Sequence, residues 1–349
     1  RGSPGQIVEI TFYGLHKTKD WIVLSLFCWG GGLFIISGLS YSFLQTFNLN
    51  NSIQFQNIFR FDPHWGYWML NFGRNFLYPT EAFYHTIVIS VIYSIFKKKQ
   101  ILTTLLLFVI SFSHPFTGIE VVLIIVSWQL CEYFYLKNKI GIKRWNLIAN
   151  LIILFIHIFY YLIFLNNNQE HYSLFSQWQT SWSMQLKNMI PAYVLVTLMF
   201  FYQIRNPYRF MKFFKDFKHR FLFIFAIIAF ILSNHEFLIE PIQPIHFSHG
   251  YIWLALFLLG VKSLQDLFLY VDKYSYSIQT IMISIILLVF LSDNLVRLSY
   301  NGIYNYKGFF GIHITKDEKD IINRFINMDY DNNTLIIARN KNIAYLSVV

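Results

Sequence analysis

The sequence predicts an all-α polytopic membrane bundle, with about nine transmembrane helices of the usual ~20-residue length. The start of a small α/β extracytoplasmic domain follows at the C-terminus. Hydrophobic residues make up 55% of the 349 residues and charged residues only 13%, whereas soluble domains contain about 25% charged residues. The apolar residues also form long runs separated by short basic clusters, a pattern typical of membrane proteins. We expect residues 1–296 to form the transmembrane domain and residues 297–349 the extracytoplasmic segment.

Each apolar run is a candidate span, because a helix needs about 20 residues to cross the hydrocarbon core. Some runs are shorter, but their aromatic flanks can extend a helix into the membrane interface. The weakest two, 101–113 and 221–233, could instead be half-spans that end in a cavity. The candidate spans are residues 21–47, 82–96, 101–113, 119–135, 147–165, 190–204, 221–233, 251–270 and 278–292.

The basic residues predict the topology, because Lys and Arg are enriched in cytoplasmic flanks. If the N-terminal flank is cytoplasmic, the outside loops between spans contain only Arg60, Arg74 and Lys187. The inside segments then contain Lys17, Lys19, Lys97, Lys98, Lys99, Lys137, Lys139, Lys143, Arg144, Arg205, Arg209, Lys212, Lys215, Lys218, Arg220, Lys262 and Lys273. This distribution explains the net charge of +10 without nucleic acid as a partner. We expect an integral, multi-pass protein of a bacterial inner or plasma membrane whose partner is the lipid bilayer.

The C-terminal segment changes character after Gly311. Thr315 and Glu318 form a capping box, which predicts a helix over 316–327. Residues 334–338 read as a buried strand, outside the membrane. The chain begins with Arg1 instead of Met and ends within an apparent strand. We therefore expect a fragment.

The first outside loop contains Asp62, His64 and Arg74, and Glu81 lies beside it. One interpretation is an interfacial loop anchored by its aromatic residues. The other is a substrate site, in which the Arg binds a phosphate group in a bidentate manner. The residue pattern favours neither.

His114 precedes Pro115 in the turn between two predicted spans. Turn and capping chemistry explains these residue types and is the favoured interpretation. Alternatively, His114 and Glu120 face a cavity, since ionisable groups at membrane depth usually face the bundle interior.

The third outside loop is rich in His and Glu. His246 and His249 have the i, i+3 spacing of a metal pair, with Glu236 or Glu240 as a further ligand. Hydrogen bonding to substrate or phosphate is the favoured role, so no metal site is assigned. A divalent cation remains the open alternative for a cofactor. The Gly30–Gly31–Gly32 run predicts a close helix–helix contact.

The four carboxyl groups at the outer ends of spans must reach water, a cation or a hydrogen-bond donor. They are Glu81, Glu120, Glu236 and Glu240. We therefore predict that the first and third outside loops and the turn 113–118 converge on one cavity.

The layout resembles the GT-C class of membrane glycosyltransferases. The turn Ser113–His114–Pro115 resembles a Ser-His-Pro turn of that class, and the tail resembles the start of its extracytoplasmic domain. The stretch from Pro244 to Tyr251 is similar to a Pro-x-His-Phe-x-Arg-Gly motif, although His249 stands at the Arg position. The resemblance implies sugar transfer from a polyprenyl-phosphate donor on the extracytoplasmic side. It also implies a catalytic acid in a loop after the first helix, which we expect this fragment to lack.

Because that acid is expected upstream, no residue of the chain is assigned as the catalytic base. Two alternatives stay open. One is a membrane polysaccharide polymerase or ligase. The other is a transporter or a non-catalytic membrane subunit, although the paired repeats typical of transporters are absent from the sequence.

Overall fold

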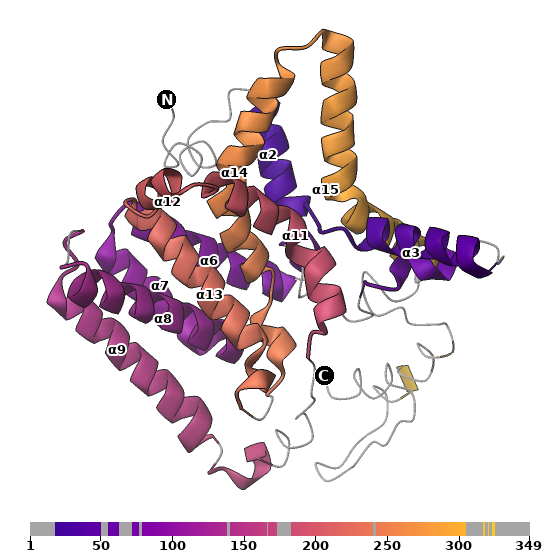
Figure 1. Cartoon of the computed structure of the whole chain (residues 1–349). Coiled ribbons are helices and arrows are strands. Elements are labelled where there is room, and N and C mark those ends of the chain that lie inside the picture. Colours follow the sequence, from indigo (N-terminus) through magenta and orange to yellow (C-terminus); the bar gives the residue numbers. More distant parts are fainter. Residues whose placement is uncertain are drawn as a thin grey trace. The chain divides into compact units, whose positions relative to one another are not determined.

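The computed structural model describes residues 18–49, 55–62, 72–76, 79–137, 140–165, 167–172, 183–239 and 242–304, with four further positions between 317 and 324. Within these ranges the chain forms helices and turns and contains no strand (Figure 1). Four helical segments are long and apolar enough to cross a membrane: Pro115–Tyr135, Arg144–Phe164, Pro244–Val271 and Tyr276–Ser299. The described part of the chain is therefore all-α, and its long apolar helices are those of a membrane protein.

The number of nine spans stays a prediction. A fifth candidate consists of two helices with a 68° bend between them, Asp20–Trp29 and Phe34–Thr46. The remaining four predicted spans are helices, but they are shorter or less apolar than the other candidates. They are α6 (Pro79–Phe96), α7 (Gln100–Ser113), α11 (Leu186–Gln203) and α13 (Phe217–Ser233).

The chain divides into one unit of residues 1–294 and a second of residues 295–349. The predicted helix 316–327 and strand 334–338 lie almost entirely outside the described residues, so the α/β segment also stays a prediction.

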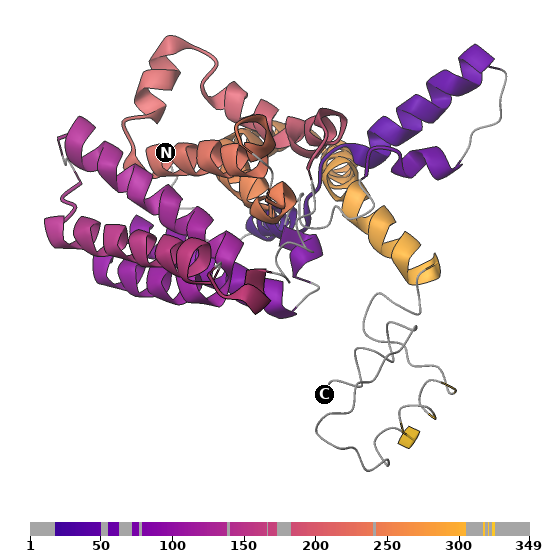
Figure 2. The ribbon, with the colours of Figure 1, turned by 90° about the horizontal axis from the view of Figure 1, so that it is seen from below.

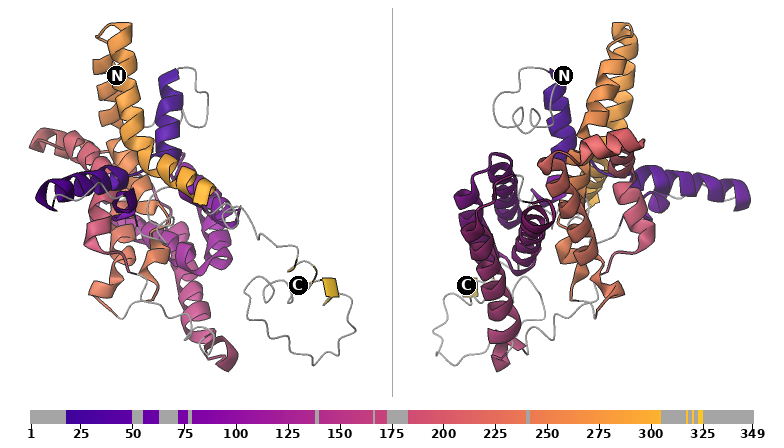
Figure 3. Two further views of the ribbon diagram at one scale, coloured as in Figure 1. Left: turned by 90° about the vertical axis from the view of Figure 1, so that its right-hand side faces the viewer. Right: turned by 60° about the vertical axis from the view of Figure 1, so that its left-hand side comes forward.

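Consecutive helices pack against one another in the first unit. α6 packs on α7, α7 on α8 (Pro115–Leu130), and α8 on α9 (Arg144–Ile158); Figure 2 shows these helices side by side. α13 packs on α8 and on α14 (Tyr251–Val271), and α14 also packs on α11. Figure 3 shows α13 and α14 beside the α6–α9 group.

A core of large apolar side chains lies between these helices. Ile125, Phe221 and Trp253 are fully buried at its centre. The face of α9 that points away from this core exposes Phe155 and Ile152. An apolar surface of this kind suits lipid contact better than water.

The two ends of the bundle differ in chemistry. At one end the Lys98 ammonium lies 5.3 Å from the Phe217 ring, and Arg220 forms an ion pair with Glu132. The basic flanks after α6, after α8 and before α13 therefore gather at this end. The opposite end holds the first turn of α6, the turn between α7 and α8, and the segment before α14. The basic flanks and these three segments thus lie at opposite ends of the bundle, which is the arrangement that the distribution of basic residues predicts.

The first predicted span, 21–47, is not one helix. It is broken into α2 (Thr18–Trp29) and α3 (Phe34–Leu49) at the glycine run. The break leaves backbone groups unpaired, and α15 (Tyr276–Tyr304) supplies their partners. Asp293 accepts the amide hydrogens of Phe34 and Ile35 at 3.0 and 2.9 Å. A carboxylate is stabilised at a helix N-terminus.

The other side of the break is also satisfied. The Asn294 amide donates to the Trp29 carbonyl at 2.7 Å. A Cβ atom at Gly32 would lie 2.1 Å from the Pro191 carbonyl oxygen of α11. The predicted close contact at the glycine run is therefore confirmed, but it occurs at a helix break.

Candidate functional site

Three separate segments build the candidate site at the non-basic end of the bundle. Glu81 lies in the first turn of α6, and His85 follows one helical turn later on the same face. His114 is the N-cap of α8 and has an extended backbone. His249 precedes α14 with a φ of 28°, which is uncommon for a residue other than glycine. It is followed by Gly250, with a φ of 75°.

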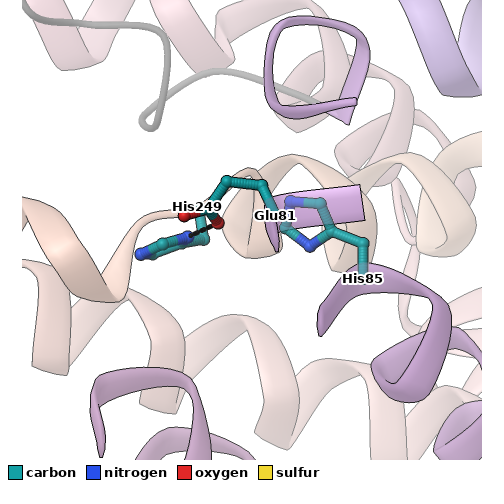
Figure 4. Close-up of side chains that lie close together, drawn as sticks. All are labelled: Glu81, His85 and His249. Atoms are coloured by element: carbon teal, nitrogen blue, oxygen red, sulfur yellow. Dashed lines mark hydrogen bonds and ion pairs between the residues drawn. The ribbon is translucent and has the colours of Figure 1, made fainter. Parts of the chain in front are cut away.

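Glu81 and His249 form a direct pair. His249 Nδ1 donates to Glu81 Oε2 at 2.9 Å (Figure 4). The His249 side chain is 1% exposed and that of Glu81 13% exposed, so the pair reaches solvent through the carboxylate. The ring of His85 is fully buried beside this pair, and its Nδ1 forms a hydrogen bond of 3.2 Å with the Tyr251 hydroxyl.

His114 performs the predicted capping role and also faces the site. Its Nδ1 accepts the Thr117 amide hydrogen at 3.1 Å. Its ring centroid lies 5.4 Å from that of His249. Burial, and secondarily a charge on His249, lower the pKa of His114 to about 3. The imidazole is therefore neutral at physiological pH, and its Nε2–H remains a hydrogen-bond donor.

His246 completes the cluster. Its ring stacks on Phe116 at 4.8 Å and lies 5.9 Å from the His249 ring. The third outside loop and the turn 113–118 therefore converge, as predicted, and Glu81 joins them. The shared water-filled cavity itself stays a prediction. His64 and Glu240 lie outside the described residues.

Asp62 and Arg74 form a separate, buried ion pair. The Arg74 guanidinium donates to both carboxylate oxygens of Asp62 at 3.0 and 3.1 Å. It also donates to the Asn294 side chain and to the Asp293 carbonyl. The predicted phosphate contact of Arg74 stays a prediction, and in this structure the guanidinium is satisfied internally. Phe72, on the same short helix α5 (Phe72–Asn75), packs against His85 at 4.8 Å.

Glu120 is fully buried in α8. Neither of its carboxylate oxygens has a hydrogen-bond partner among the described residues. Glu120 therefore lies in the bundle interior, whereas the cavity that it was predicted to face stays a prediction. An isolated ionised carboxylate is costly in such surroundings, which favours the uncharged form.

Sequence reasoning missed His85. The signal was available in the i, i+4 spacing of Glu81 and His85, which places both on one face of a helix. The alternative metal pair of His246 and His249 with a Glu of the third loop stays a prediction. The carboxylate partner of His249 is Glu81, from the first turn of α6.

The cluster combines a partly exposed carboxylate with four imidazoles, those of His85, His114, His246 and His249. Neutral imidazoles can donate to a phosphate group through N–H or bind a cation through a lone pair. No family model, curated protein or solved structure matches this chain. Whether the cluster binds a phosphate group or a cation must therefore be argued from its geometry.

Proposed function

We propose that this chain is a multi-pass enzyme that transfers a sugar from a polyprenyl-phosphate donor to an acceptor on the extracytoplasmic side of a bacterial inner or plasma membrane. One observation carries the proposal. Glu81, His114, His246 and His249 come from three separated segments and meet at the bundle end opposite the basic flanks. A donor anchored in the bilayer by its polyprenyl chain presents its phosphate at this depth.

The histidines suit the leaving group. The acceptor hydroxyl forms a bond to the anomeric carbon, and the bond from that carbon to the phosphate oxygen breaks. The phosphate departs with the electron pair, and the acceptor proton goes to a general base or to the departing phosphate. N–H donors of His114 and His246 stabilise the negative charge that develops on the phosphate oxygen.

The topology belongs to the proposal. We expect the basic flank at Lys98 to be cytoplasmic and Glu170 to be outside, because basic residues are enriched in cytoplasmic flanks. Single cysteines at these positions, in a variant without Cys28 and Cys131, should be distinguished by an impermeant maleimide added to intact cells. Labelling is expected at position 170 and not at position 98. The reverse pattern would invert the topology and remove the site from the outer side.

Transfer activity tests the function directly. The purified full chain should move radiolabelled sugar from a panel of polyprenyl-phosphate pentoses and hexoses to a glycan or lipid acceptor. We expect His114→Ala and His246→Ala each to lower kcat by about 10²–10³-fold, the usual loss when one charge-stabilising donor is removed. Glu170→Gln, in a different outside loop, is the matched control and should retain full activity.

A wild-type protein that transfers no sugar from any of these donors would contradict the proposal. So would double-histidine variants as active as the control. A ligase or polymerase would differ by accepting a lipid-linked oligosaccharide as its donor, which the same assay can include.

Transport is the second candidate function, and the broken span α2–α3 favours it. Discontinuous helices line the substrate sites of many transporters. In this structure the Asp293 and Asn294 side chains form hydrogen bonds with backbone groups on the two sides of the break. Both side chains therefore already have backbone partners. Sugar or ion counterflow in sealed vesicles, abolished by Asp293→Asn but not by His246→Ala, would support transport over transfer.

A further inference from the structure

We propose that Glu81, His85 and His249 form a binding site for a divalent metal ion of the zinc type. Each offers one ligand atom, and the three atoms lie within 4.8 Å of one another. Zinc sites are usually tetrahedral with ligands about 2.1 Å from the ion, which places two ligand atoms ~3.4 Å apart. A contraction of up to ~1.4 Å from the 4.8 Å limit would therefore bring all three ligand atoms to one ion. Figure 4 shows the three side chains gathered in this way.

The donor set matches the chemistry of catalytic zinc. Two imidazoles and one carboxylate leave a fourth coordination position open for water or a substrate oxygen. Two of the ligands come from consecutive turns of α6, which fixes their separation. The third comes from the segment just before α14, so an ion would join two helices that are distant in sequence.

The surroundings of His85 support a ligand role. Tyr251 holds Nδ1 of His85 at 3.2 Å. Nε2 is buried and has no hydrogen-bond partner in the described part of the chain. An outer hydrogen bond of this kind fixes the orientation and tautomer of a metal-binding histidine. A buried ring nitrogen without a partner is costly, and an ion would remove that cost.

The pair of Glu81 and His249 supports the same inference. A proton lies between Nδ1 and the carboxylate, and metal binding replaces such protons. The backbone of His249 is held at φ 28°, an unusual conformation of the kind that clusters at ligand sites. The partly exposed Glu81 gives an ion access to the otherwise buried site.

The inference depends on the geometry of these three residues and not on the proposed sugar transfer. The two are compatible, because the rings of His114 and His246, where the donor phosphate is proposed to bind, lie 5.4 and 5.9 Å from the ring of His249. An ion there would supply a Lewis acid for the phosphate oxygen.

Metal titration of the full chain in detergent, after dialysis against a chelator, tests the site. We expect one equivalent of Zn²⁺ to bind and to raise the thermal unfolding temperature, because a ligand that binds only the folded state stabilises it. Glu81→Gln and His85→Ala should each weaken binding by at least ~10- to 100-fold, the range seen even for outer-shell changes. Parallel titrations with Mn²⁺ and Mg²⁺ define the preference, and Mg²⁺ is expected to bind weakly because its preferred ligands are oxygens.

His171→Ala is the matched control, because it removes a histidine outside the cluster and should leave zinc affinity unchanged. If His85→Ala fails to fold, Glu81→Gln still decides the question because its side chain is partly exposed. A wild-type protein that binds no zinc, or variants that bind it as tightly as wild type, would overturn the site. Sugar transfer by a protein that binds no zinc would count against the metal site alone, and zinc binding without transfer would count against the proposed function alone.

Discussion

Replacement of Arg74 by alanine is expected to lower the free energy of unfolding by about 3–5 kcal/mol, the usual cost of removing one partner from a buried ion pair. The Asp62 and Arg74 side chains are 0% and 4% exposed. The change would leave the Asp62 carboxylate without its partner. It would also remove the guanidinium from Asn294, which closes one side of the α2–α3 break. Unfolding in detergent, followed by circular dichroism, would measure the loss.

Two variants make this result specific. Lys262→Ala removes a pair with Asp266 whose side chains are 49% and 37% exposed, so its cost should stay within about 1 kcal/mol. The double variant Asp62→Leu/Arg74→Met removes both charges and should recover most of the loss. A Lys262→Ala variant as unstable as Arg74→Ala would show that burial is not the cause.

The second large effect is expected at Gly32, where Gly32→Ala should destabilise the protein at the upper end of the range of about 1–3 kcal/mol for overpacking. The added methyl group would lie 2.1 Å from the Pro191 oxygen and 2.7 Å from the Ala192 Cα atom. These are backbone atoms of α11, so a rotamer change cannot relieve the clash. The same unfolding assay applies.

Ser40→Ala is the matched control for Gly32→Ala. It places the same side chain on an exposed position of α3, where substitutions usually change stability by no more than ~0.5 kcal/mol. Equal stability of the two variants would mean that α11 does not approach the break as closely as this structure describes. A loss confined to Gly32→Ala would confirm that the glycine is required for packing.

The membrane bundle could be predicted because hydropathy is a local property of the chain. Apolar runs mark helices wherever they pack, and the basic flanks mark the ends of the spans. The turn at His114 was also local, since Pro115 follows directly and His114 caps the helix by accepting the Thr117 amide hydrogen three residues later. The grouping of the turn 113–118 with His246 and His249 followed from the topology, because alternate loops lie at the same end of a bundle.

Tertiary structure decided which side chains meet. The break between α2 and α3 is capped by Asp293, which is 259 residues from Phe34, and no local pattern predicts such a distant partner. Arg74 forms an ion pair with Asp62 because the two side chains are buried together. His85 joins Glu81 and His249 only because α6 lies beside the start of α14. The sequence alone therefore determined the helical, apolar character of the described residues and the end of the bundle at which the polar residues gather, but not the break in the first predicted span. The partners of each buried polar group depended on packing between distant segments, because a group removed from water must be satisfied by whatever lies beside it.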